Sequence, residues 1–130
     1  MPRGRPPYRG LKNAIPVARA RGRVMRFFQD DECAADLLIA ARGGIIFVRI
    51  RRSIRIRIPI SDLEAEFREP VLMLRSLPRS GHILREFWLY SKYGTWRYFR
   101  VDETGLVEID YAGQPLPLPV PNQGKIPAAL

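Results

Sequence analysis

The strongest pattern in the chain is an alternation of apolar and basic residues between positions 45 and 58. Side chains alternate between the two faces of a β-strand, so each face here has its own chemistry. One face takes Val48, Ile50, Ile54, Ile56 and Ile58. The other face takes Arg49, Arg51, Arg55 and Arg57. The pattern predicts strands over 45–51 and 53–59 that bury one face and expose a row of guanidinium groups on the other.

Two segments have apolar residues at the spacing of an amphipathic helix. The first covers 31–42 and ends at Gly43, a residue type favoured just past a helix C-terminus. Its apolar face consists of Cys33, Ala34, Leu37, Leu38 and Ala41. The second begins at Ser61 and Glu64, which have the spacing of a capping box, and Pro70 predicts either a kink or the start of another helix. Its apolar face consists of Leu63, Phe67, Val71 and Leu74.

The last third of the chain alternates strand-forming segments with turn residues. Strands are predicted over 84–91, 95–101 and 106–110. The order of elements is therefore helix, two strands, helix and three strands. This order predicts a single small α+β domain with a mixed or antiparallel sheet, and a length of 130 residues agrees with one domain.

Both ends of the chain lack a pattern that would pack. Residues 1–26 contain Arg-Gly pairs and prolines with few large apolar residues, which is typical of a disordered basic arm. Residues 111–130 are rich in proline, and four of these prolines recur at every second position, which favours an extended conformation. The globular domain is thus expected over 27–110, between two flexible termini.

The net charge of +9 is unevenly distributed. Residues 1–26 contain eight Lys or Arg and no acid, whereas residues 27–130 contain 14 basic and 13 acidic residues. Arginine outnumbers lysine 19 to 3, and its planar fork suits the oxygens of a phosphate. The arm therefore carries nearly all of the excess charge, and the Arg row belongs to a nearly neutral domain.

Nucleic acid is the expected partner of these arginines, with DNA preferred to RNA, although the residues alone leave that choice open. The contact residues would be Arg49, Arg51, Arg55 and Arg57 of the strands, and Arg19, Arg21, Arg23 and Arg26 of the arm. The alternative is that the Arg row pairs with acids of this chain or of a partner protein. The nearest such acids are Asp30, Asp31, Glu32 and Asp36 before the row, and Asp62, Glu64, Glu66 and Glu69 after it.

The remaining candidate residues carry weaker signals. Trp88 and Trp96 alternate with arginines, so they either stack on bases or belong to the core. His82 is the only histidine and has no cysteine or second histidine with which to share a metal, and Cys33, the only cysteine, is expected to pack on the apolar face of the first helix. We therefore expect no catalytic residue, no metal and no cofactor. The lack of a long apolar run predicts no membrane partner, and the location is expected to be cytoplasmic.

Three segments together resemble a known family. A helix with Glu32 leads into Gly43-Gly44 and the strand from Ile45, the capped helix from Ser61 follows, and a hairpin ends at 94–101. In this order they resemble the archaeal Holliday junction resolvases, which have the restriction-endonuclease-like fold. The resemblance covers about residues 30–101 and implies a DNA-binding domain that can form a homodimer.

The resemblance fails at the residues that would cut DNA. The resolvases hold a metal with an acid early in the first helix, an Asp, and a Glu-x-Lys on the central strands. Here Glu32 matches the first acid, no Glu-x-Lys occurs, and Arg55 and Arg57 stand where carboxylates are needed. Arginines repel Mg²⁺, so the chain is expected to be a non-catalytic nucleic-acid-binding domain. A protein-interaction or structural module is the alternative, and a metal-dependent nuclease using acids such as Glu32, Asp36 and Glu86 is the third reading.

Overall fold

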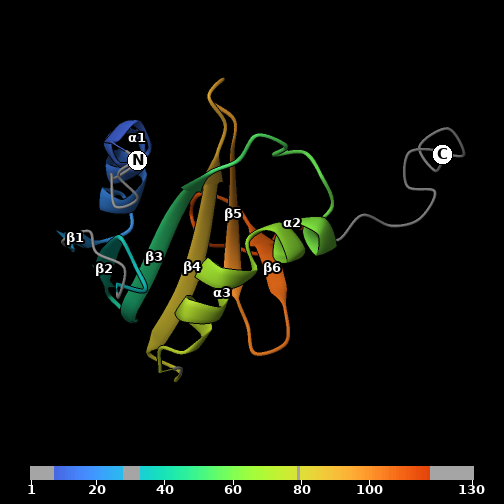
Figure 1. Cartoon of the computed structure of the whole chain (residues 1–130). Coiled ribbons are helices and arrows are strands. Elements are labelled where there is room, and N and C mark those ends of the chain that lie inside the picture. The colour runs from blue at the N-terminus through green and yellow to red at the C-terminus, as the bar shows by residue number, and fades with distance from the viewer. Residues whose placement is uncertain (1–7, 28–32, 79, 118–130) are drawn as a thin grey trace, which may run out of the picture.

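The computed structural model describes residues 8–27, 33–78 and 80–117. These residues form three helices and a mixed sheet, which confirms the α+β class, and Figure 1 shows how they are arranged. The helices are α1 (Tyr8–Arg19), α2 (Ile60–Glu66) and α3 (Arg68–Arg75). The strands are β1 (Arg23–Arg26), β2 (Leu37–Ala41), β3 (Gly44–Arg52), β4 (Ile83–Tyr90), β5 (Trp96–Val101) and β6 (Leu106–Ile109).

The six strands lie in the sheet in their chain order, from β1 at one edge to β6 at the other. Neighbouring strands are antiparallel, except that β3 and β4 are parallel. A parallel pair needs a crossover connection, and α2 with α3 supplies it. The carboxyl ends of β3 and β4 therefore lie side by side at the same end of the sheet. A loop follows β3 there, and a hairpin turn follows β4 (Figure 1).

The middle of the sheet is covered on both faces. On one face, Ile46, Val48 and Ile50 of β3 pack in a core cluster with α1. On the other face, Phe47 packs against a second cluster that contains α2 and α3 together with Phe87 of β4. A strand that is buried on both faces cannot present an exposed row of charged side chains along its length.

The prediction of a disordered arm over 1–26 is wrong for residues 8–26, because these residues form α1 and β1. Leu11, Ala14 and Ala18 recur at helical spacing and are buried against the sheet. Pro16 lies inside α1 without ending it. This short apolar stripe is difficult to recognise in the sequence because prolines and Arg-Gly pairs surround it. The helix is stable only because its apolar face packs against the sheet.

The helix predicted over 31–42 is also wrong. Residues 37–41 form β2, which pairs with both β1 and β3, and Arg42-Gly43 is the turn to β3. Leu37 and Ile39 are fully buried in the α1 cluster, so the period of this segment is two. Residues 28–32, where that helix would begin, lie outside the described part of the chain. A short apolar run fits either period, and here its strand neighbours select the β conformation.

The second strand predicted over 53–59 does not form, since β3 ends at Arg52 and a loop follows. The predicted helix begins at Ile60 with Pro59 as its N-cap, and no side chain caps it, so the expected capping box at Ser61 is wrong. The break expected near Pro70 is confirmed, because Phe67 separates α2 from α3.

The predicted strands of the last third are confirmed within a residue or two at each end as β4, β5 and β6. The proline-rich tail is not extended from its start. A turn at 111–113 folds the chain back, and Pro115 forms a bridge to Ile109. Residues 118–130 lie outside the described part of the chain.

Gly44 begins β3 where two backbones come close together. A Cβ at this position would lie 2.0 Å from the carbonyl oxygen of His82, and the φ angle is +153°. We therefore expect Gly44→Ala to lower the free energy of unfolding by more than about 1 kcal/mol, measured by urea denaturation. Gly43→Ala is the matched control, because a Cβ there meets nothing within 4 Å. Equal stability of the two variants would contradict this account.

Candidate nucleic-acid interface

Arg49 lies in the interior, not on a charged surface. Its side chain is 3% exposed, and Nη1 donates to Oδ1 of Asp36 at 3.0 Å. Nη2 donates to the carbonyl oxygen of Cys33, and Oδ2 of Asp36 accepts the backbone N–H of Ile50 at 2.7 Å. Asp36 thus ties the segment before β2 to β3, and Arg49 is unavailable to a phosphate.

Arg51 shares the same acid but is half-buried. Its Nη1 lies 3.7 Å from Oδ2 of Asp36. Burial and the neighbouring Arg49 lower the pKa of Arg51 from its usual value, while Asp36 and Glu69 act in the opposite direction. The first two arginines of the predicted row are therefore largely engaged in contacts with Asp36 of the same chain.

Arg55 and Arg57 follow the end of β3 and are exposed. Arg55 Nη2 lies 3.3 Å from Glu66 Oε1 on α2, in an ion pair open to solvent. For Arg57, no carboxylate of the described residues lies within ion-pair distance. The expected exposed row along β3 does not exist, and only its second half, now in a loop, faces solvent.

A groove of about 500 Å³ lies where this loop meets the β4–β5 hairpin. We call it the loop groove, and its lining residues are Ile54, Arg55, Ile56, Arg57, Ile58, Ser91, Tyr93 and Thr95. It lies beyond the carboxyl ends of the parallel strands β3 and β4, which is where open sheets with such strands usually bind ligands. Two further exposed cations adjoin it in the chain, Arg52 and Lys92.

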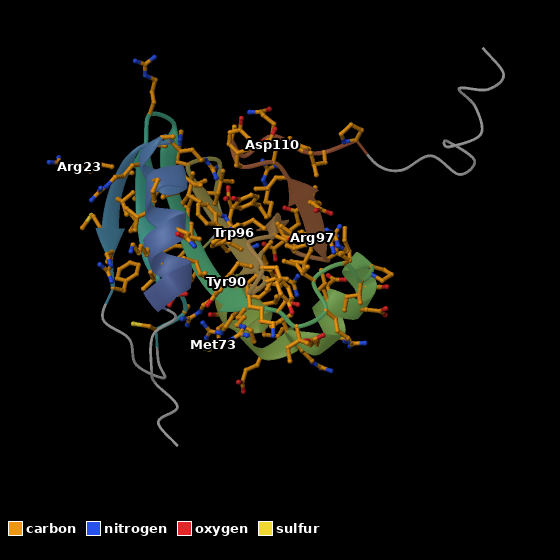
Figure 2. All side chains as sticks on the ribbon, turned by 90° about the horizontal axis from the view of Figure 1, so that it is seen from above. Arg23, Met73, Tyr90, Trp96, Arg97 and Asp110 are labelled. Atoms are coloured by element: carbon orange, nitrogen blue, oxygen red, sulfur yellow. The ribbon has the colours of Figure 1, made fainter. Side chains whose placement is uncertain are left out.

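Hydrogen bonds hold both walls of the loop groove. On one side, Nη1 of Arg97 donates to the carbonyl oxygens of Ile56 and Ile58 at 2.8 and 2.7 Å. The same guanidinium forms two hydrogen bonds with Glu108. In Figure 2, Arg97 lies on the side of the molecule that carries α2. The sequence analysis missed this residue, since no local pattern shows that an arginine of β5 bonds a loop some forty positions earlier.

The other wall is the hairpin turn after β4. The backbone N–H of Ser91 donates to the carbonyl oxygen of Thr95, and the backbone N–H of Gly94 donates to the carbonyl oxygen of Ser91. The Ser91 hydroxyl accepts hydrogen bonds from the backbone N–H groups of Tyr93 and Thr95, both at 3.2 Å. Gly94 has a φ of +91°, a conformation that glycine adopts without strain. These bonds hold Tyr93 at the tip, where the residue is 83% exposed and Lys92 Nζ lies over its ring, 5.1 Å from the centroid. Tyr93 and Lys92 were not among the predicted site residues.

The four arginines predicted for the arm have different environments. Arg19, Arg23 and Arg26 are exposed, and Figure 2 shows Arg23 at the outer side of the molecule. Arg21 instead forms a two-pronged ion pair with Glu86, with distances of 2.8 and 2.7 Å. Glu86 is fully buried, so Arg21 fastens the end of α1 to the centre of the sheet.

Both tryptophans belong to or pack against the core, Trp88 in its interior and Trp96 at its margin. Trp88 is fully buried and its Nε1 donates to Glu86 at 2.9 Å, which confirms the core reading for this residue. Trp96 is half-buried and stacks between Tyr90 and Tyr98, with centroid separations of 5.2 and 5.9 Å. Figure 2 shows Tyr90 and Trp96 together in the middle of the molecule. Burial raises the pKa of the Tyr98 phenol above its usual value.

Residues that could perform metal chemistry are dispersed. Within residues 8–27, 33–78 and 80–117, no three His, Cys, Asp or Glu side chains gather to hold a metal ion. His82 is exposed in a turn, where Nδ1 lies 3.3 Å from the carbonyl oxygen of Gly43. Cys33 precedes β2 in an irregular segment, not on the apolar face of a helix. None of the described helices is long and apolar enough to cross a membrane.

The charge divides along the chain at the loop. Residues 1–59 contain 14 Lys or Arg and four acids, whereas residues 60–130 contain eight and nine. The excess of basic over acidic residues therefore extends beyond residues 1–26. It continues through the sheet strands β1 to β3 and into the loop groove. Comparisons with family models, with curated proteins and with solved structures found no match for this chain.

Proposed function

We propose that the protein is a non-catalytic nucleic-acid-binding domain that contacts phosphates at the carboxyl end of β3 and β4 and acts in the cytoplasm. The observation that carries the proposal is the loop groove, a concave site with two arginines and no carboxylate among its described lining residues. The exposed cations Arg52 and Lys92 adjoin it. A cluster of cations that faces solvent attracts a polyanion, and release of counterions from the phosphates favours binding.

The exposed arginines of α1 and β1 extend the proposed interface. Arg19, Arg23 and Arg26 remain candidates for phosphate contacts, as proposed from the sequence. Arg21 and Arg49 do not, because each is engaged with a buried carboxylate. DNA is the partner that we favour, on the strength of the sequence resemblance to the resolvases, and that resemblance also leads us to propose a homodimer.

A restriction-endonuclease-like ancestry remains part of the proposal, with revised positions. Asp36 lies against β3, and Arg49-Ile50-Arg51 has the spacing of the Glu-x-Lys that the resolvases carry on a central strand. On this alignment a guanidinium occupies the space near Asp36 where a nuclease would hold its metal. The helix expected to carry Glu32 does not form over 37–41, and Glu32 itself lies outside the described residues. These points favour binding without cleavage over the metal-dependent nuclease.

A protein-interaction or structural module is the second candidate. It is favoured by the ion pairs of Arg49, Arg51 and Arg55, which satisfy three of the four predicted row residues within the chain. On this alternative the loop groove would contact an acidic surface of another protein and would not contact phosphates.

The test is the salt dependence of binding to labelled DNA and RNA oligonucleotides, measured by fluorescence anisotropy on the full chain. The double variant Arg52→Ala/Arg57→Ala is expected to weaken binding to all sequences and to lower the slope of log affinity against log salt by about 1 for each arginine. Variants at Arg49 are unsuitable here, since the buried ion pair with Asp36 makes them unstable.

The matched control is Arg42→Ala/Arg68→Ala, which removes the same charge from exposed positions that do not line the loop groove. Arg42 lies in the turn before β3, at the opposite end of that strand from Arg52. We expect this control to retain most of the affinity and of the salt slope. If both double variants bind equally, or if the wild type binds neither DNA nor RNA at low salt, the proposal is wrong and the interaction module is preferred.

A further inference from the structure

The loop groove has a chemistry that a phosphate contact alone does not explain. Ile54 is 91% exposed and Tyr93 is 83% exposed, and these are the two most exposed large apolar side chains of the described residues. Both line the same groove, one from each wall. Apolar side chains held in water at the mouth of a cationic groove match a ligand with both a flat apolar face and a negative charge.

We propose that the loop groove binds unpaired nucleotides of a single strand, with a base stacked on Tyr93 and packed near Ile54. This inference rests on the proposed function and names its substrate. The phosphates next to that base would lie near Arg57 and Lys92. Lys92 Nζ lies over one face of the Tyr93 ring, 5.1 Å from its centroid, so the base would stack on the opposite face with a cation close by.

The size of the groove favours an unpaired nucleotide over a duplex. The groove has a volume of about 500 Å³, within the range of small-molecule sites, and it is open to solvent because Ile54 and Tyr93 in its lining are exposed. In a duplex the bases are stacked on each other, and the outer surface offers phosphates that neither Tyr93 nor Ile54 can use. In a single strand each base has a free aromatic face, and stacking on an aromatic side chain is the usual source of affinity.

The groove is also prepared for binding before any ligand arrives. Arg97 holds the carbonyl groups of Ile56 and Ile58, and the hydroxyl of Ser91 holds the turn that carries Tyr93. A site whose walls are already ordered loses less conformational entropy on binding. Arg97 is therefore a positioning residue for the loop, although it lines no part of the groove itself.

The experiment compares a thymidine oligonucleotide with a duplex of the same length, using the full chain and anisotropy at fixed salt. Tyr93→Ala is expected to weaken binding of the single strand by about fivefold to a hundredfold, the range for loss of one stacked base. Tyr93→Phe keeps the ring and should bind as the wild type does. Duplex binding should be unchanged in both variants.

Tyr111→Ala is the matched control, because Tyr111 is another exposed tyrosine, 67% accessible, that does not line the groove. It should leave single-strand affinity unchanged. If Tyr93→Ala binds the single strand as well as the wild type does, or weakens duplex binding equally, this inference is wrong while the proposed function stands. If the wild type binds neither oligonucleotide at low salt, both are wrong.

Discussion

Replacing Asp36 by alanine is expected to lower the free energy of unfolding by about 3–5 kcal/mol, the usual cost of removing one partner from a buried ion pair. Asp36 is 1% exposed and Arg49 is 3% exposed, so the guanidinium would be left charged in the interior. The backbone N–H of Ile50 would lose its acceptor as well. Urea denaturation followed by circular dichroism measures the change.

The control for Asp36 is an ion pair of similar geometry in solvent. Arg55 and Glu66 are 3.3 Å apart with exposed side chains, and Glu66→Ala should cost less than about 1 kcal/mol. A second comparison is Asp36→Leu with Arg49→Met, which removes both charges. We expect this pair to recover part of the loss, because an uncharged replacement leaves no unpaired ion. An Asp36→Ala variant as stable as the Glu66→Ala variant would disprove the buried pair.

Replacing Glu86 by alanine is expected to be similarly costly, at about 3–5 kcal/mol, and to loosen α1 in particular. Glu86 is fully buried in β4 and binds both Arg21, which follows α1, and Nε1 of Trp88. Its loss leaves a guanidinium and an indole N–H without an acceptor. Amide hydrogen exchange should therefore speed up in α1 and β1 more than in β5 and β6.

Glu103 provides the matched control for Glu86. It is also a carboxylate paired with an arginine, at 3.3 Å from Arg85 Nη2, but its side chain is 56% exposed. Arg85 keeps hydrogen bonds to the carbonyl oxygens of Arg75, Leu77 and Val101 when Glu103 is removed. Glu103→Ala should thus change stability by less than about 1 kcal/mol. Uniform exchange throughout Glu86→Ala would show that α1 does not depend on this contact.

These two acids change how the basic composition is interpreted. Arg21 and Arg49 were candidates for nucleic acid, and each instead neutralises a buried carboxylate. Like Arg49, Arg85 is buried, and it donates hydrogen bonds to backbone carbonyl oxygens, so it is not available at the surface. Each of these buried pairs is neutral and leaves the net charge of +9 unchanged, but fewer basic side chains are available at the surface than the 22 Lys and Arg of the sequence.

Local sequence patterns were sufficient to predict the strands in the last third of the chain. The strands β4, β5 and β6 follow each other through short turns, so the residues that pair are close in sequence. Tyr93-Gly94 marks the first turn, and Gly94 adopts a positive φ there. Pro70 likewise predicted a kink or the start of a second helix, and a separate helix, α3, begins two residues before it, because proline affects only its own neighbourhood.

Contacts between residues that are distant in the sequence decided the structure of the rest of the chain. The alternation from 45 to 58 correctly predicted that β3 is a strand with two different faces, but it carried no information on what would cover each face. Helix α1 covers one face and α2 with α3 covers the other, so Arg49 is buried beside Asp36 while Arg55 and Arg57 fall in a loop. Residues 37–41 became a strand for the same reason, since β1 and β3 were available to pair with them.

The loop groove depends entirely on tertiary structure. Its walls come from 54–58 and 91–95, which are brought together because β3 and β4 are parallel neighbours. Composition and periodicity specify which residues are basic, apolar or turn-forming, because those are properties of each residue and its near neighbours. Which arginines meet a buried acid and which meet solvent is set by packing across the sheet, where the free energy of burying a charge far exceeds any local preference.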